Sequence, residues 1–232
     1  MIGGTPLDER HDVIIPAWNE ADTIVPIIDV LARHDYIKTI IVGIDGKTTD
    51  DTFANVASLA AYVSACNSYL VVIGAPCHGK GQVVQHALAM TDRMALQPSA
   101  RVLLCDADIT GLSGDHVTEL IAPNEGMVIG IADIPPNLPD FAVRAWPWVG
   151  GQRAVPRSLL EKANVHGYLM ETQLNQAAAK AGIPVKHAYL SGLKSRFNMT
   201  PRRLEDMEYY RQWGYQRGIL ARPPIPRQRK AG

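Results

Sequence analysis

Short apolar runs alternate with longer amphipathic stretches along the first half of the chain. The runs are rich in Val and Ile and predict strands, whereas the stretches between them repeat apolar residues at helical spacing. Strands without a polar face, separated by helices, are typical of a parallel sheet that helices cover on both sides. The pattern therefore predicts an α/β protein with a Rossmann-like, mostly parallel sheet in a single domain. The expected strands are residues 11–16, 38–44, 69–73, 102–105 and 127–132, and the expected helices are 19–34, one that starts at 49, 79–96 and 113–121.

The second half is less regular. Residues 133–151 are rich in Pro, Trp and Gly and fit no regular element, so we expect a long loop of the kind that forms a lid or a binding wall. Asn19 and Ser113 are suited to cap the helices that they precede, because their short side chains accept bonds from free backbone N–H groups. Beyond the loop, we expect helices at 156–163, 168–181 and 200–216, a last strand at 184–190, and a loose, basic, Pro-containing tail at 222–232.

Charge balance argues against a nucleic-acid binder. The 232 residues carry 23 basic and 23 acidic side chains, whereas proteins that contact phosphate backbones usually have a basic excess. The three cysteines are too few and too widely spaced for a disulfide framework or a zinc site. The N-terminus has no apolar signal segment, and polar residues and a turn interrupt the uncharged stretch at 52–77. We therefore expect a cytoplasmic protein without a membrane span.

Charged and glycine-containing loops follow the predicted strands. The carboxyl ends of parallel strands meet at one edge of a sheet, so these loops are expected to line one ligand site. Asp106 and Asp108 follow a buried strand and are one residue apart. Hard cations such as Mg²⁺ or Mn²⁺ prefer carboxylate ligands of this sort together with substrate phosphates. The loops are residues 16–20, Asp45, residues 75–81 and residues 106–108.

A glycine–lysine–glycine motif opens the third predicted helix. Glycine lets the backbone approach a ligand, and the N-terminus of a helix together with Lys80 attracts phosphate. Gln82 follows Gly81, so the spacing of a Walker A loop is absent. The residues alone therefore indicate an α/β enzyme that binds a nucleotide or a phosphate, with a metal at Asp106 and Asp108.

Six motifs in order resemble family 2 glycosyltransferases, which have the GT-A fold. The resemblance covers roughly residues 11–195. Two of the motifs match without change, namely G-K-G at 79–81 and D-x-D at 106–108. The others resemble the V-I-P-x-[YW]-N-E opening (13–20), the D-D-G-S-T-D-x-T loop (43–52), the S-G-x-R-A loop (150–154), and the G-Y-x-x-E helix start of the polyprenyl-phosphate and glucosyl-3-phosphoglycerate synthase branches (167–171).

The resemblance implies a metal-dependent glycosyltransferase of the hexosyltransferase class. Such an enzyme moves a sugar from a nucleoside diphosphate sugar, here a UDP- or GDP-sugar, to an acceptor that we expect to be soluble. It implies one domain at 1–221, with a nucleotide-sugar-binding half at 11–132 and an acceptor-side half at 133–221. The implied donor-binding residues are Pro16, Ala17, Glu20, Asp45, Lys80, Asp106 and Gly151, the metal ligands are Asp106 and Asp108, and the catalytic residues are Asp108, Glu171 and Arg153.

The chain departs from the family pattern in two places. Ile44 stands where the first Asp of the D-D-G-S-T-D loop is usual, which leaves the base of the donor open. Some relatives supply a late His to the metal from a segment comparable to 189–196, where this chain has none, so His187 is the nearest candidate ligand. Among Glu171, Asp133 and Asp140, Glu171 is the preferred general base, and inversion and retention stay open.

Two other kinds of protein stay open. A sugar nucleotidyltransferase shares the architecture and the metal site, but it normally carries a glycine-rich signature after the first strand, which residues 16–20 lack. A sugar-nucleotide-binding protein without turnover agrees with the loss of an Asp at Ile44. The acceptor is also open, with a modified nucleobase among the candidates, and so is the oligomeric state, a homodimer included.

Overall fold

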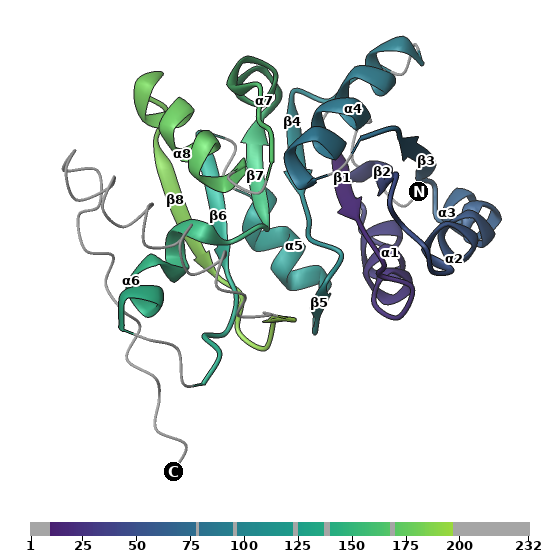
Figure 1. The fold of residues 1–232 in the computed structure, drawn as a ribbon, viewed down its shortest axis with the longest axis horizontal. Helices are drawn as coiled ribbons and strands as arrows, with labels where there is room; N and C mark the ends of the chain where they lie inside the picture. Colours follow the sequence, from purple (N-terminus) through teal and green to yellow (C-terminus); the bar gives the residue numbers. More distant parts are fainter. Residues whose placement is uncertain are drawn as a thin grey trace, which may run out of the picture.

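The computed structural model describes residues 10–77, 79–94, 97–122, 125–136, 140–167 and 170–196, and the predicted helix at 200–216 and tail at 222–232 lie outside them. In this part of the chain, a seven-stranded sheet has the order β3-β2-β1-β4-β7-β6-β8 and carries helices on both faces (Figure 1). The predicted α/β fold with a mostly parallel sheet is confirmed. The strands are β1 (His11–Ala17), β2 (Ile37–Asp45), β3 (Tyr69–Ala75), β4 (Arg101–Leu104), β6 (Met127–Ile131), β7 (Arg153–Pro156) and β8 (Val185–Tyr189).

Eight helices and a small separate ribbon surround this sheet in the described residues. The ribbon pairs β5 (Ile109–Thr110) with β9 (Lys194–Ser195), and the sequence pattern predicts neither strand because each is only two residues long. The helices are α1 (Ile24–Ala32), α2 (Thr52–Ser58), α3 (Ala60–Ala65), α4 (Lys80–Arg93), α5 (Gly114–Ile121), α6 (Asp140–Val149), α7 (Arg157–Ala163) and α8 (Met170–Lys180).

The first half follows the predicted pattern closely. β1 lies between β2 and β4 and is parallel to both, and β3 is parallel to β2 at the edge. Val13 and Ile15 of β1 pack into the core shared with α1 and α5, whereas Ile14 packs into the core shared with α4, α7 and α8. Both faces of the strand are thus buried, which explains why its apolar run is continuous.

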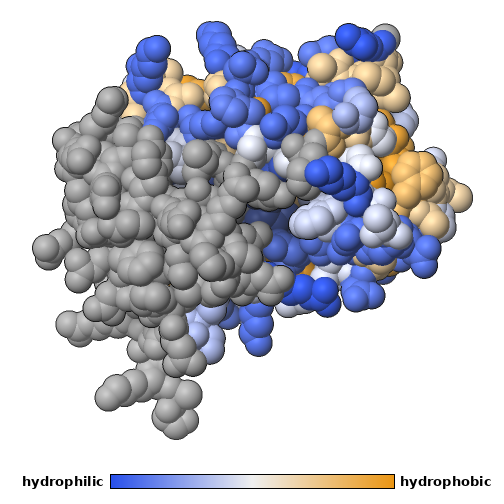
Figure 2. All heavy atoms as spheres, in the orientation of Figure 1, coloured by the Kyte–Doolittle hydropathy of each residue, from blue (hydrophilic) through white to orange (hydrophobic). Residues whose placement is uncertain are grey.

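The uncharged stretch at 52–77 folds as α2, α3 and β3. Figure 2 shows a hydrophobic area at the right-hand edge of the molecule, the side on which Figure 1 places these three elements. Among the described residues, no helix is both long enough and apolar enough to cross a lipid bilayer.

β7 is a central strand that the sequence pattern does not predict. It lies antiparallel between β4 and β6, although residues 150–154 were expected to form a loop. Its four residues include Arg153 and Pro156, so no apolar run marks it in the sequence. Pro156 pairs with Arg101 at the last position of the strand, where the missing N–H of proline is tolerated.

The expectation of an irregular loop at 133–151 is wrong for its second part, which forms α6. Trp146 and Trp148 are buried in the two different cores, one on each side of the sheet. The indole N–H of Trp146 also donates to the carbonyl oxygen of Ala132 at 2.9 Å. Tertiary packing of these rings stabilises a helix that Pro147 and the neighbouring glycines made improbable from local pattern alone.

Of the two predicted caps, one is confirmed and one is wrong. Ser113 caps α5, because its hydroxyl accepts from the backbone N–H of His116. Asn19 does not cap α1, which begins later, at Ile24. Asn19 instead has a positive φ of 55°, and its side-chain oxygen accepts from the backbone N–H of Thr49 at 2.8 Å. It therefore joins the loops that follow β1 and β2.

Candidate functional site

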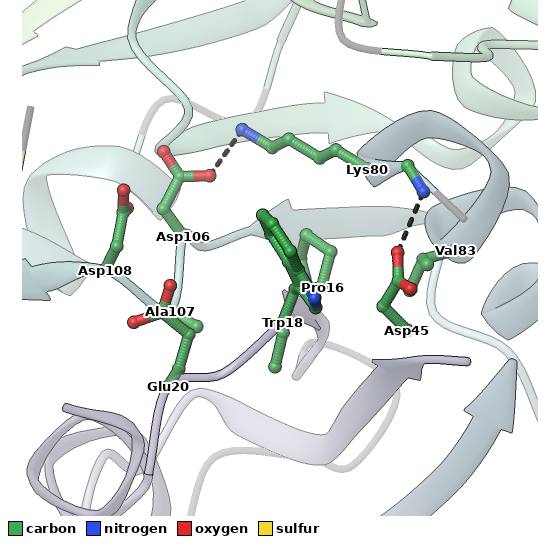
Figure 3. A pocket seen from close by; sticks show the side chains of 11 residues that line it. Pro16, Trp18, Glu20, Asp45, Lys80, Val83, Asp106, Ala107 and Asp108 are labelled. Carbon is green, nitrogen blue, oxygen red and sulfur yellow. Dashed lines mark hydrogen bonds and ion pairs between the residues drawn. The ribbon is translucent and has the colours of Figure 1, made fainter. Parts of the chain in front are cut away.

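A hollow of about 600 Å³, including the part open to solvent, lies at the carboxyl ends of β1, β2 and β4 (Figure 3). This is the edge at which the sequence predicted a ligand site. Seven of the predicted site residues line it. The lining residues are Pro16, Ala17, Trp18, Glu20, Asp45, Gly79, Lys80, Val83, Asp106, Ala107 and Asp108.

The loop after β1 forms one wall of the hollow. Trp18 is 48% exposed, and its indole N–H donates to the carbonyl oxygen of Lys47 at 3.3 Å. In Figure 3 the ring stands between the Asp45 and Asp108 ends of the pocket. The sequence interpretation gave Trp18 no role, although an aromatic residue directly after a buried strand was a usable signal. Its exposed face offers a stacking surface to a planar ligand.

Glu20 reaches the pocket from the same loop. Burial raises the pKa of its carboxyl, the hydroxyl bond from Thr23 opposes that effect, and the negative charges of Asp106 and Asp50 add to it. The hydroxyl of Thr23 donates to Glu20 Oε2 at 2.9 Å. Glu20 is therefore an acid held close to other acids, as is usual where a cation or a basic group completes a site.

Asp45 lines the pocket but uses its carboxylate to hold the surrounding loops. Oδ1 accepts from the backbone N–H of Lys47 at 2.8 Å, and Oδ2 accepts from the backbone N–H of Gly79 at 2.8 Å. Only 4% of the residue is exposed. Asp45 thus fixes the entry to α4, and its contact with a ligand would be an additional role.

The start of α4 packs against the loop before α8 rather than facing the hollow with free amides. The backbone N–H of Gly81 donates to the carbonyl oxygen of Gly167 at 2.9 Å, and Gln82 Oε1 accepts from the backbone N–H of Gly167 at 2.6 Å. A Cβ atom at Gly81 would lie 2.6 Å from the Cα atom of His166. Gly81 therefore serves close packing, whereas Gly79 and Lys80 line the hollow.

Lys80 joins two acidic residues from distant parts of the chain. Its ammonium group pairs with Asp106, which follows β4, and with Glu171 in the first turn of α8, at 2.5 Å from the latter (Figure 3 draws the first pair). Burial lowers the pKa of Lys80, but the attraction of the two carboxylates outweighs it and the pKa is raised overall. Lys80 is thus a permanent cation, and Glu171 lies behind it rather than on the pocket wall.

Asp106 is also fixed from the side of β7. Gly151 lies so close that a Cβ atom there would be 1.8 Å from Asp106 Oδ2. The predicted donor residue Gly151 therefore contacts the D-x-D segment directly and leaves room for its carboxylate. Among the described residues, no group of three His, Cys, Asp or Glu side chains is arranged to hold a metal ion by itself.

Arg153, which was predicted to be catalytic, is not among the residues that line the pocket. The residue is 0% exposed. Its guanidinium donates at 2.6 Å to each of three acceptors, namely the carbonyl oxygens of Trp148 and Gly150 and the side-chain oxygen of Asn175. These bonds join the end of α6, the turn before β7 and α8. Arg153 therefore positions the Gly150–Gly151 turn and has no face for a substrate.

His187, the predicted additional metal ligand, is likewise not among the residues that line the pocket. It lies on β8, opposite Ile129 of β6, at the far end of the sheet. Its ring packs edge-on against Trp148, with 4.6 Å between the ring centroids. Burial, the larger effect, and the positive charge of Arg153 lower the pKa of His187. It is a neutral packing residue.

The fold is that of GT-A glycosyltransferases. Glucosyl-3-phosphoglycerate synthase from Mycobacterium tuberculosis, solved with Mn²⁺, UDP and glucosyl-3-phosphoglycerate, is 18% identical with a TM-score of 0.62, over 96% of this chain and 84% of that chain. Mannosyl-3-phosphoglycerate synthase from Rubrobacter xylanophilus is 19% identical with a TM-score of 0.60, over 94% and 78%. TarS residues 1–349 from S. aureus, in complex with UDP, is 14% identical with a TM-score of 0.55, over 92% and 66%. No protein-family model and no curated protein sequence matches the chain.

Proposed function

We propose that the chain is a metal-dependent glycosyltransferase that moves a sugar from a nucleoside diphosphate sugar to a soluble acceptor. The observation that carries this proposal is the pocket at the carboxyl edge of a GT-A fold, where Asp106 and Asp108 stand beside Lys80. Support comes from glucosyl-3-phosphoglycerate synthase, which has the same fold and was solved in complex with UDP and Mn²⁺.

Asp106 and Asp108 suit a divalent cation. Mg²⁺ and similar ions are commonly held by one or two carboxylates together with waters and substrate phosphates, so no third protein ligand is needed. The ammonium group of Lys80 already pairs with Asp106, which indicates that this carboxylate attracts positive charge. A bound cation would neutralise the negative charge that develops on the diphosphate when the sugar–phosphate bond breaks.

The chain's own residues bind and orient the donor in this proposal. Pro16 and Ala17 provide an apolar wall for the base and ribose, and Trp18 provides a stacking face. Lys80 is protonated at every physiological pH and donates to the diphosphate when a ligand competes with its carboxylate partners. Glu171 then loses its ion pair and becomes free to contact the sugar or the acceptor hydroxyl.

A thermal-shift panel tests the donor site. The panel contains UDP, GDP, ADP and CDP and their hexose conjugates, each with and without Mn²⁺. At a ligand concentration of 100 times Kd, binding adds about 2.7 kcal/mol of stability. For a chain of this size that is a rise in Tm of about 5–10 °C. We expect one nucleoside diphosphate to give such a rise in the presence of Mn²⁺.

Asp108→Asn should abolish the metal-dependent part of this rise. Glu119→Gln removes an equal charge from an exposed position on α5 and should preserve the full rise. A rise that is the same in both variants would place the metal elsewhere, and no rise with any nucleotide would remove the donor site altogether. Release of the free diphosphate from the stabilising sugar conjugate then separates an enzyme from a binding protein without turnover.

A further inference from the structure

A second basic residue stands beside the D-x-D segment, on a part of the chain that is far away in the sequence. β5 begins directly after Asp108 and pairs antiparallel with β9, with Ile109 opposite Ser195. Continuing this register by one residue places Arg196 opposite Asp108. The backbone N–H of Arg196 donates to the carbonyl oxygen of Asp108 at 2.8 Å, which fits that pairing. The two residues are therefore neighbours across the ribbon.

The pairing sets where the Arg196 side chain starts. Directly opposed residues in an antiparallel pair project from the same face, with Cβ atoms about 5 Å apart. Asp108 lines the pocket, so the side chain of Arg196 leaves the ribbon next to the pocket wall. Arg196 is exposed, and its positive charge acts on Glu20, which lines the pocket from the loop after β1. Arg196 is not among the residues that line the hollow, but its backbone bond to Asp108 and its effect on Glu20 place it close to two residues that do.

Two cations accordingly flank the acidic residues of the pocket. Lys80 approaches from α4 and is tied to Asp106 and Glu171. Arg196 approaches from β9, on the Asp108 side, and is open to solvent. A guanidinium is planar and offers paired N–H donors that match two phosphate oxygens, which an ammonium group cannot do.

We propose that Arg196 is a diphosphate-binding residue of the donor site, an inference that rests on the proposed function. Arg196 donates to the diphosphate oxygens from the side of the pocket opposite Lys80. Its contribution to affinity is present without a metal ion, because the charge that it supplies is its own. Removing the guanidinium weakens the binding of a nucleoside diphosphate but leaves the binding of the free nucleoside unchanged.

Calorimetric titration of four proteins, the wild type and three variants, tests this role. The ligands are the nucleoside diphosphate that gives the largest thermal shift and its parent nucleoside, each with and without Mn²⁺. Arg196→Gln should lower the affinity for the diphosphate by about ten- to a hundredfold, both with and without Mn²⁺. This is the change in affinity that corresponds to the loss of hydrogen bonds to a charged group. Arg196→Lys should recover part of the loss. Lys186→Gln, which removes one exposed charge from β8, should bind as the wild type does.

Each outcome separates the role of Arg196 from that of the donor site. Equal diphosphate affinity in Arg196→Gln and the wild type would overturn the assignment while leaving the donor site in place. An equal loss for the diphosphate and the nucleoside would also overturn it, because the effect would then not involve the phosphates. A wild type that binds no nucleoside diphosphate would refute the donor site and this inference together. The backbone bond to Asp108 survives any replacement except proline, so folding should be preserved.

Discussion

Two clusters of charged side chains lie at opposite edges of the same sheet, and only one of them faces the pocket. At the carboxyl edge, Lys80 pairs with Asp106 and Glu171. At the amino edge, Arg157 pairs with Asp12 and with two further acids. Each cluster joins residues that are far apart in the sequence around one basic side chain. Their chemistry is similar, so their positions must account for any difference in role.

The amino-edge cluster closes the base of the sheet. Asp12 Oδ2 accepts from the backbone N–H of Ser99 at 2.8 Å and lies 3.8 Å from Arg157 Nη1. Arg157 also pairs with Asp92 at 2.5 Å and Glu161 at 3.0 Å. Asp12 and Arg157 are both buried, and neither lines the hollow. This cluster therefore stabilises the fold.

The comparison teaches that paired charges alone do not identify a site in this fold. What distinguishes the carboxyl-edge cluster is that it faces a hollow, where loops from several strands bring further acids within reach. A ligand in the hollow can replace one partner of Lys80, whereas the pair of Asp12 and Arg157 does not line the hollow, so a ligand there can replace neither partner. Substitutions should accordingly cost mainly binding at one edge and mainly stability at the other.

The largest effect is expected for Asp12→Ala. Removing this carboxylate leaves Arg157 paired only with two half-exposed acids among the described residues, and it leaves the Ser99 N–H without its acceptor. Breaking a buried pair costs about 3–5 kcal/mol, which urea unfolding measures. Nucleoside diphosphate affinity of the folded protein should stay unchanged. Asp92→Ala, which removes an exposed partner of the same arginine, should cost less than about 1 kcal/mol. A loss of ligand affinity in Asp12→Ala would contradict the proposal that the amino-edge cluster serves only stability.

Next in size is the effect of Gly151→Ala. The new methyl group would overlap Asp106 Oδ2, so the carboxylate must turn away from its present position. We expect a loss of metal-dependent nucleotide affinity of at least about tenfold, with a stability cost of about 1–3 kcal/mol from overpacking. Gly74→Ala is the matched control, because a Cβ atom at Gly74 meets no atom within 4 Å. Unchanged affinity in Gly151→Ala would show that the exact position of Asp106 does not matter.

These two clusters also show what the sequence could and could not predict. The parallel strands β1 to β4 and the residues that follow them were predictable, because long β-branched runs mark buried parallel strands and topology brings their ends together. The ion pair between Lys80 and Glu171 was not, because it depends on a contact across 91 positions of the sequence. α6 and β7 were missed since buried tryptophans and non-local strand pairing, not local pattern, stabilise them.

The same reason explains why the sequence did not predict where Arg153 and His187 lie. A motif shared with a family predicts that a residue type is present but not which way it points. Arg153 occupies a strand whose existence was not predicted, and both faces of that strand are buried. His187 lies on β8, four strands away from β1 and beyond β4, β7 and β6, and it is not among the residues that line the pocket.

A smaller effect on stability is expected for Glu171→Gln. The amide oxygen can still accept from Lys80, and Lys80 keeps Asp106 as a partner, so stability should change by less than about 1 kcal/mol. Nucleoside diphosphate affinity should change little for the same reason. Sugar transfer should fall by about 10²-fold or more if Glu171 contacts the acceptor hydroxyl as a general base. Turnover equal to the wild type, measured by diphosphate release, would assign Glu171 to holding Lys80 only.

The smallest effect concerns pH and Glu20, an acid on the pocket side of the comparison. Burial, the largest influence, raises the pKa of its carboxyl, and it outweighs the opposing bond from Thr23. A carboxyl whose pKa is higher in the folded state than in the unfolded state binds its proton more tightly when folded, so its ionisation at neutral pH lowers stability. That cost disappears as the pH falls below the ordinary value of 4.5, because both states then hold the proton. Glu20→Gln should therefore melt at a higher temperature than the wild type at pH 7, and the difference should shrink towards pH 4. A difference in melting temperature that stays constant or grows on acidification would contradict this. It would mean that the pocket stabilises the ionised carboxylate of Glu20, as the partners of Asp12 stabilise that carboxylate at the amino edge.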